Sequence, residues 1–126
     1  MKEGAKTTSF SAEQAAPPEP GIPLVMAEAL AKTYVRGREP VRALDNVSFR
    51  IERGEFTAIV GPSGSGKTTL LNLLGCLDSP TSGTLRILGQ QVQSLDETER
   101  TRLRRIHFGF VFQHFGLLSA LTVTEN

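Results

Sequence analysis

The feature that most constrains the fold of this 126-residue chain is a glycine-rich segment, GPSGSGKTT, at residues 61–69. It follows a short apolar run, Phe56–Val60 (FTAIV), and it precedes leucines at helical spacing, namely Leu70, Leu73, Leu74 and Leu77. An unbroken apolar run between turn residues is typical of a strand that is buried on both faces, as in the middle of a parallel sheet. The sequence therefore predicts a strand, a loop and a helix whose leucine face packs on the sheet.

The glycine-rich segment also predicts a binding site for phosphate, because it satisfies G-x-x-x-x-G-K-[ST] between a strand and a helix. Glycines keep side chains away, so that successive backbone N–H groups can converge on a phosphate. The helix adds free N–H groups and the positive end of its dipole. Lys67 brings a charge near the β and γ phosphates, and Thr68 places a hydroxyl where Mg²⁺ would bind. The predicted binding residues are Gly61, Pro62, Ser63, Gly64, Ser65, Gly66, Lys67, Thr68 and Thr69.

Further elements are predicted on both sides of this loop. Val47, Phe49 and Ile51 alternate with polar residues, which predicts a strand with one covered face. The patterns then predict a turn at Gly54 and Glu55, a turn at Pro80–Gly83, a strand through Leu85 and Ile87, a charged helix over Asp96–Arg105 and a strand over Gly109–Phe112. Helix propensity favours a helix over Met26–Lys32. Residues 1–23, rich in Ala, Glu, Ser and Pro, are expected to form a flexible tail.

Composition narrows the class of protein. Lys and Arg total 14 against 13 Asp and Glu, a net charge of +1, which gives no field to recruit nucleic acid or an anionic membrane surface. We expect no nucleic-acid partner, no bilayer-spanning segment and, by default, a cytosolic location. Cys76 is the only cysteine, so an intramolecular disulfide is impossible, and it is expected to be a small packing residue.

Outward from the loop, the chain resembles an ABC-transporter ATPase from Leu24 to Asn126. The resemblance rests on LAKTYVRG, on ERGEF before GPSGSGKTT, on PTSG after it and on FGFVFQ. LRRIHFGFVFQHFGLLSALT looks most like the lipoprotein-releasing and macrolide-exporter branch. The resemblance implies an α/β, P-loop NTPase fold that is incomplete: N-terminal strands and the phosphate-loop helix are present, whereas the helical subdomain and the Walker B half are absent. It also implies that Met26–Tyr34 begins as a strand.

The resemblance assigns roles to individual residues, with ATP and Mg²⁺ as cofactors. Tyr34 would stack on adenine, and its alternative is an ordinary half-buried tyrosine at a strand end. Lys67 and Gln113 would be catalytic, since Gln113 matches the glutamine that ligates Mg²⁺ and helps to orient attacking water. His114–Thr124 would face a membrane partner, or its apolar residues would pack within the same domain. Neither His107 nor His114 matches the switch histidine of the family.

What the resemblance implies for the whole protein is an ATPase that powers export or extraction of a substrate at a membrane. Its partners would be a transmembrane permease subunit or domain and a second ATP-binding domain, and it would lie at the inner face of the cell membrane. The signature motif, the Walker B aspartate, the catalytic glutamate and the switch histidine do not occur in these 126 residues, so the chain alone is expected to be inactive. The alternatives are a non-enzymatic nucleotide-binding fragment and another P-loop enzyme such as a small-molecule kinase.

Overall fold

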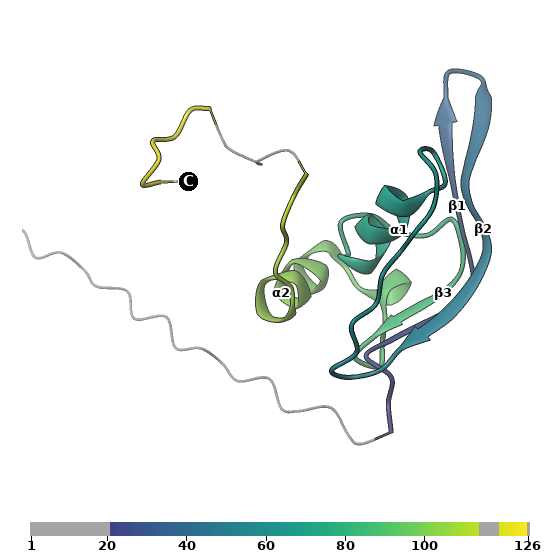
Figure 1. Ribbon diagram of the computed structural model, residues 1–126, viewed down its shortest axis with the longest axis horizontal. Helices are drawn as coiled ribbons and strands as arrows, with labels where there is room; N and C mark the ends of the chain where they lie inside the picture. Colours follow the sequence, from purple (N-terminus) through teal and green to yellow (C-terminus); the bar gives the residue numbers. More distant parts are fainter. Residues whose placement is uncertain (1–20, 114–118, 126) are drawn as a thin grey trace, which may run out of the picture.

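The computed structural model describes residues 21–113 and 119–125. Most of the expected tail therefore lies outside the described residues, as do residues 114–118 of the segment expected to face a partner. In chain order the elements are β1 (Val25–Arg36), β2 (Glu39–Ile51), α1 (Lys67–Leu74), β3 (Ser82–Ile87), β4 (Gln90–Gln91), the short 3-10 helix η1 (Val92–Ser94) and α2 (Glu97–His107). Figure 1 shows α1 and α2 beside a curved sheet whose longest part is the hairpin of β1 and β2.

The sheet has the strand order β2-β1-β3-β4, and every neighbouring pair is antiparallel. β1 is central near its start, where Ala27 lies opposite Phe49 in β2 and opposite Leu85 in β3. β3 begins at Ser82, opposite Ala31 in β1. Past Ala31, β1 pairs only with β2, and in this two-stranded hairpin Tyr34 lies opposite Val41. The segment predicted as helix by propensity, Met26–Lys32, is thus a strand, as the family resemblance implied.

One hydrophobic core lies between the sheet and the helices. Its buried members come from β1, β2, β3, α1, η1 and α2 and from the turn after α1: Val25, Ala27, Leu30, Leu44, Leu73, Cys76, Leu85, Ile87, Val92 and Leu103. Leu70 and Leu74 pack against this core, which confirms the predicted leucine face of α1. Burial raises the pKa of the Cys76 thiol, in keeping with its predicted packing role.

Two predicted strands do not form. Phe56–Val60 has no strand partner among the described residues, and Phe56 is 96% exposed. Gly109–Phe112 likewise pairs with no described strand, and the Val111 side chain is fully exposed. A strand buried on both faces needs neighbours on both edges and a layer over each face. The four described strands pair only with one another, so these two predictions were wrong for this chain.

The other local predictions agree with the structure in part or in full. In β2 the side chains of Val47, Phe49 and Ile51 are half-buried and the polar residues between them are exposed, which confirms the predicted alternation. The turn at Gly54 forms, with Gly54 at φ 74°. The predicted turn at Pro80–Gly83 is too long, since β3 already begins at Ser82. α1 ends at Leu74, so Leu77 lies outside it. The helix stops because Cys76 adopts φ 54° and the Leu77 amide bonds back to the Asn72 carbonyl at 2.9 Å.

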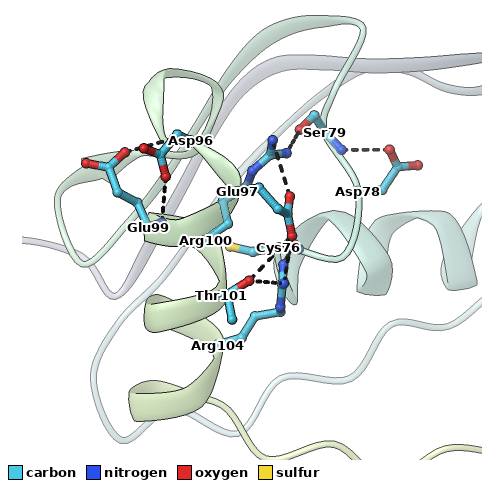
Figure 2. A network of polar contacts seen from close by, with 9 residues as sticks. All are labelled: Cys76, Asp78, Ser79, Asp96, Glu97, Glu99, Arg100, Thr101 and Arg104. Carbon is cyan, nitrogen blue, oxygen red and sulfur yellow. Dashed lines mark hydrogen bonds and ion pairs between the residues drawn. The ribbon is translucent and has the colours of Figure 1, made fainter.

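The predicted charged helix is α2, and its start is defined by a capping box. The carboxylate of Asp96 accepts a hydrogen bond from the Glu99 amide, and the carboxylate of Glu99 accepts one from the Asp96 amide, each at 2.8 Å (Figure 2). These bonds satisfy amide donors that would otherwise lack a partner at the helix start. Acidic residues in the first turn and basic residues in the last turn also suit the helix dipole.

Candidate functional site

The glycine-rich loop lies immediately before α1 and is held against β2 at Gly66. A Cβ at Gly66 would lie 2.4 Å from the carbonyl oxygen of Ala43 and 2.9 Å from the side chain of Leu44. Gly66 also has φ 89°, in the left-handed region that side chains disfavour. No other residue fits both requirements, so glycine at this position lets the loop approach the sheet closely.

The side chain of Lys67 folds back over its own loop. Nζ donates hydrogen bonds to the carbonyl oxygens of Gly61 at 2.8 Å and Pro62 at 2.6 Å, and a longer one to the hydroxyl of Ser65 at 3.4 Å. All three acceptors are neutral. Within the described part of the chain, Lys67 forms no ion pair with a carboxylate. Its positive charge is therefore positioned over the loop without being neutralised there.

The start of α1 places backbone hydrogen-bond donors next to the Lys67 ammonium. The first hydrogen bond within the helix is donated by the Leu70 amide to the Gly66 carbonyl, at 2.9 Å, so the amides before Leu70 precede the helical ladder. Gly66 offers no side-chain cap, and the first turn of α1 contains no acidic residue. The hydroxyl-bearing residue Thr68 is exposed at this end. Free amides, the positive end of the helix dipole and the Lys67 ammonium together favour a bound anion.

Tyr34 lies near this loop through the register of the hairpin. Its strand partner, Val41, is two residues from Ala43, a separation of about 7 Å along a strand. Ala43 is the residue that Gly66 approaches. The Tyr34 ring is half-buried, and its hydroxyl donates a hydrogen bond of 2.9 Å to Oδ2 of Asp78. The ammonium of Lys32 lies 4.9 Å from the centre of the ring.

Asp78 and Lys32 were not predicted as members of the site. Lys32 Nζ donates to Oδ1 of Asp78 at 2.6 Å and to the carbonyl of Ser79 at 2.7 Å. Burial alone would raise the pKa of the Asp78 carboxyl, but the hydrogen bonds from Lys32, the Ser79 amide and Tyr34 and the charge of Lys32 outweigh it and hold the pKa below its usual value. The only signal in the sequence was the spacing of Lys32 and Tyr34, which places both on one face of a strand.

Gln113 is the last described residue before the gap at residues 114–118. It is exposed after the segment that follows α2, and among the described residues it makes no hydrogen bond with Lys67 or Thr68. Over residues 21–113 and 119–125, no group of three or more His, Cys, Asp or Glu side chains is arranged to hold a metal ion. In the same residues, no helix has the length and apolar character needed to cross a membrane.

The remaining residues of the loop form an exposed turn. A Cβ at Gly61 would lie 2.6 Å from the hydroxyl of Ser65, which can rotate away, so Gly61 is less constrained than Gly66. Ser63, Gly64 and Ser65 form an exposed turn, with Gly64 at φ 80°. This turn lies between Gly61, whose carbonyl accepts a hydrogen bond from Lys67, and the start of α1. Backbone amides in such a turn are a common feature of anion sites.

Comparison with known proteins relates this chain to a family. Residues 44–126 match the family described as ABC transporter. The macrolide export ATP-binding/permease protein MacB of Hyphomonas neptunium is 53% identical over 104 residues, which cover 82% of this chain and 16% of that protein. MacB of Escherichia coli K12 is 51% identical over 104 residues, with the same coverage of 82% and 16%. This chain thus spans only a small part of the curated relatives that it matches.

A solved structure extends the comparison to three dimensions. The dimeric, post-hydrolysis structure of the ATP-binding cassette MJ0796 bound to ADP and Pi aligns with a TM-score of 0.75 and 48% identity, over 80% of this chain and 44% of that one. The similarity confirms an α/β fold that corresponds to part of an ATP-binding cassette. The sequence match covers the glycine-rich loop, α1, β3 and α2. From its sequence and its fold alike, the chain belongs to the ABC transporter family.

Proposed function

We propose that this chain is the ATP-binding part of an ABC transporter ATPase that powers export or extraction of a substrate at a membrane. The observation that carries the proposal is the environment of Lys67. Its ammonium is held over the loop by neutral oxygens, at the start of a helix whose first turn contains no acidic residue. An anion that enters the loop can replace those oxygens as the partner of Nζ, and a charged acceptor binds an ammonium more strongly than a neutral one.

The proposal gives each site residue a role. The amides of the loop and the Lys67 ammonium hold the phosphates, and the exposed hydroxyl of Thr68 serves as a ligand to Mg²⁺. Tyr34 stacks on the adenine. Gln113 would ligate Mg²⁺ and help to orient the attacking water. Mg²⁺, when bound with ATP, supplies neutralisation of the charge that develops on the transferred phosphoryl group.

The proposed partners follow from the relatives. MacB proteins are named ATP-binding/permease proteins, and the similar cassette structure is described as dimeric. We therefore propose a transmembrane permease domain or subunit as one partner and a second ATP-binding domain as the other. Such an assembly would place this chain at the cytoplasmic face of a membrane.

A second candidate function is nucleotide binding without hydrolysis. It is the function expected if Gln113, which is exposed, does not reach the metal and the water at the bound phosphates. In that case the site would retain the phosphate and adenine contacts, but it would lack a group that orients the attacking water. Binding and turnover therefore have to be measured separately.

The proposal is tested by ATP hydrolysis of the whole protein that contains this chain. We expect Lys67→Ala to reduce the rate to background, since it removes the charge nearest the phosphates. Arg53→Ala is the matched control, because it removes an exposed positive charge from the segment between β2 and the loop. Equal turnover in Lys67→Ala and wild type would overturn the ATPase assignment, whereas binding of ATP without turnover in wild type would favour the second candidate.

A further inference from the structure

The hydroxyl of Tyr34 and the ammonium of Lys32 meet on one carboxylate, that of Asp78. Tyr34 donates to Oδ2 at 2.9 Å, and Lys32 donates to Oδ1 at 2.6 Å. Only 12% of the Lys32 side chain and 30% of the Asp78 side chain are exposed. The hydrogen bond to Asp78 fixes the position of the Tyr34 hydroxyl, at the far end of the ring. Asp78 therefore anchors two groups at once: the end of the Tyr34 ring and the Lys32 ammonium.

Lys32 also determines which face of the Tyr34 ring is free. Its Nζ lies 4.9 Å from the ring centre, within the range of a cation–π contact. One face of the ring is thus occupied by the Lys32 ammonium. A planar base that stacks on Tyr34 has only the opposite face available.

The loop that carries Asp78 is itself fixed from α2. Arg104 donates to the carbonyl oxygen of Cys76 at 2.6 Å, and Arg100 donates to the hydroxyl of Ser79. Figure 2 shows the two guanidinium groups reaching from α2 to residues on either side of Asp78. Glu97 forms ion pairs with both arginines and so restrains them. The carboxylate that holds Tyr34 therefore belongs to a segment with little freedom to move.

α1 connects the glycine-rich loop to the loop that carries Asp78. The helix begins beside Gly66, which approaches Ala43 in β2, and the turn after its C-terminus contains Asp78, which bonds to Tyr34 in β1. One short helix thus fixes the spacing between the phosphate loop and the tyrosine ring.

From this arrangement we infer that Asp78 is a positioning residue for adenosine recognition: with Lys32, it orients the Tyr34 ring so that one face is presented to the base at a fixed distance from the phosphate loop. The inference rests on the proposed function, because it takes the ligand of the loop to be a nucleotide. Asp78 itself does not contact the nucleotide. It should therefore affect the recognition of adenosine and leave the recognition of the phosphates unchanged.

The test compares two ligands on the whole protein, Mg²⁺ with ATP and Mg²⁺ with tripolyphosphate, which lacks adenosine. Dissociation constants are measured by titration calorimetry for wild type, Asp78→Ala, Asp78→Asn and Tyr34→Phe. We expect Asp78→Ala and Tyr34→Phe each to weaken ATP binding by about tenfold, equivalent to about 1.4 kcal/mol. Tripolyphosphate binding should change less than about twofold, since no phosphate donor is removed. Tyr34→Phe keeps the ring and its packing, so it tests the same hydrogen bond without a risk to folding.

A double variant and a control sharpen the result. The double variant Tyr34→Phe with Asp78→Ala should bind ATP about as tightly as the single variant of lower affinity. Both substitutions remove the same hydrogen bond, so their effects should not add. Asp45→Ala, which removes the exposed carboxylate paired with Arg42, should leave both ligands unaffected. Equal weakening of ATP and tripolyphosphate by Asp78→Ala, or no effect on ATP, would overturn the inference. Failure of wild type to bind ATP, or equal ATP binding by Lys67→Ala, would instead overturn the proposed function.

Discussion

Nζ of Lys67 lies 2.8 Å from the carbonyl oxygen of Gly61, six residues earlier in the chain and at the other end of the glycine-rich loop. This bond closes the loop on itself. It also keeps the ammonium at the start of α1, where the amides of the first turn are free of helical partners. A phosphate oxygen in the same position would satisfy the ammonium and the amides together, which is the physical basis of the proposed site.

The close approach of Gly66 to Ala43 predicts a difference between two loop glycines. Both Gly64 and Gly66 have positive φ, so alanine is strained at either position. At Gly66 a Cβ would also meet the Ala43 carbonyl at 2.4 Å, whereas at Gly64 it would meet nothing within 4 Å. We expect Gly64→Ala to lower the free energy of unfolding by about 1 kcal/mol and Gly66→Ala by at least about 2 kcal/mol more. Chemical unfolding measures both, and equal effects would contradict the clash.

The capping box of α2 predicts a moderate loss of stability. Asp96→Ala removes the acceptor of the Glu99 amide and should lower the free energy of unfolding by about 1 kcal/mol. Asp45→Ala, in an exposed ion pair, should change it by less than about 0.5 kcal/mol. Urea unfolding followed by circular dichroism provides the comparison. If the two variants were equally stable, the box would contribute nothing to α2.

The carboxyl of Asp78 predicts a pH dependence. Its pKa in the folded chain lies below the ordinary value of 3.8 because the bonds from Lys32, Ser79 and Tyr34 outweigh the effect of burial. A depressed folded-state pKa gives stability that is present above the unfolded pKa and is lost as the pH falls through the folded pKa. Wild type should therefore be more stable than Asp78→Asn at neutral pH, and the difference should shrink below about pH 4. Thermal unfolding at several pH values tests this, and a difference that grows on acidification would contradict it.

Exposed apolar side chains predict that the 126-residue chain is poorly soluble by itself. Phe56 and Val60 are 96% and 90% exposed, and Val111 is fully exposed. Such side chains, together with the free edges of unpaired segments, favour association. Light scattering coupled to size-exclusion chromatography should detect species larger than a monomer, and Phe56→Gln with Val60→Thr should reduce them. A monodisperse monomer that unfolds cooperatively would count against this prediction.

The sequence predicted elements whose signals are local. Alternation at Val47, Phe49 and Ile51 is reproduced in β2, and the polar signals at Asp96 and Glu99 define the start of α2. Residues Met26–Lys32 form a strand although their helix propensity favours a helix. Ala27 lies between Phe49 and Leu85 in the sheet, and pairing on both edges outweighs a weak intrinsic preference.

Predictions from the sequence were wrong where the structure of a segment depends on residues far away in the chain. Phe56–Val60 and Gly109–Phe112 have the composition of buried strands, yet an apolar run does not specify which strands will lie beside it. Of the site, the loop and Lys67 could be predicted from spacing alone. Asp78 could not, since it reaches Tyr34 across 44 residues of sequence through the turn after α1.

The central claim is that Lys67 and its loop bind the phosphates of ATP, and equilibrium binding tests it most directly. The dissociation constant for ATP with Mg²⁺ would be measured by calorimetry for the whole protein and for Lys67→Ala, with Arg53→Ala as the control. Because the variant loses the charge-assisted contact with the phosphates, its affinity should fall by at least about tenfold, while the control should match wild type. Unchanged affinity in Lys67→Ala would contradict the claim.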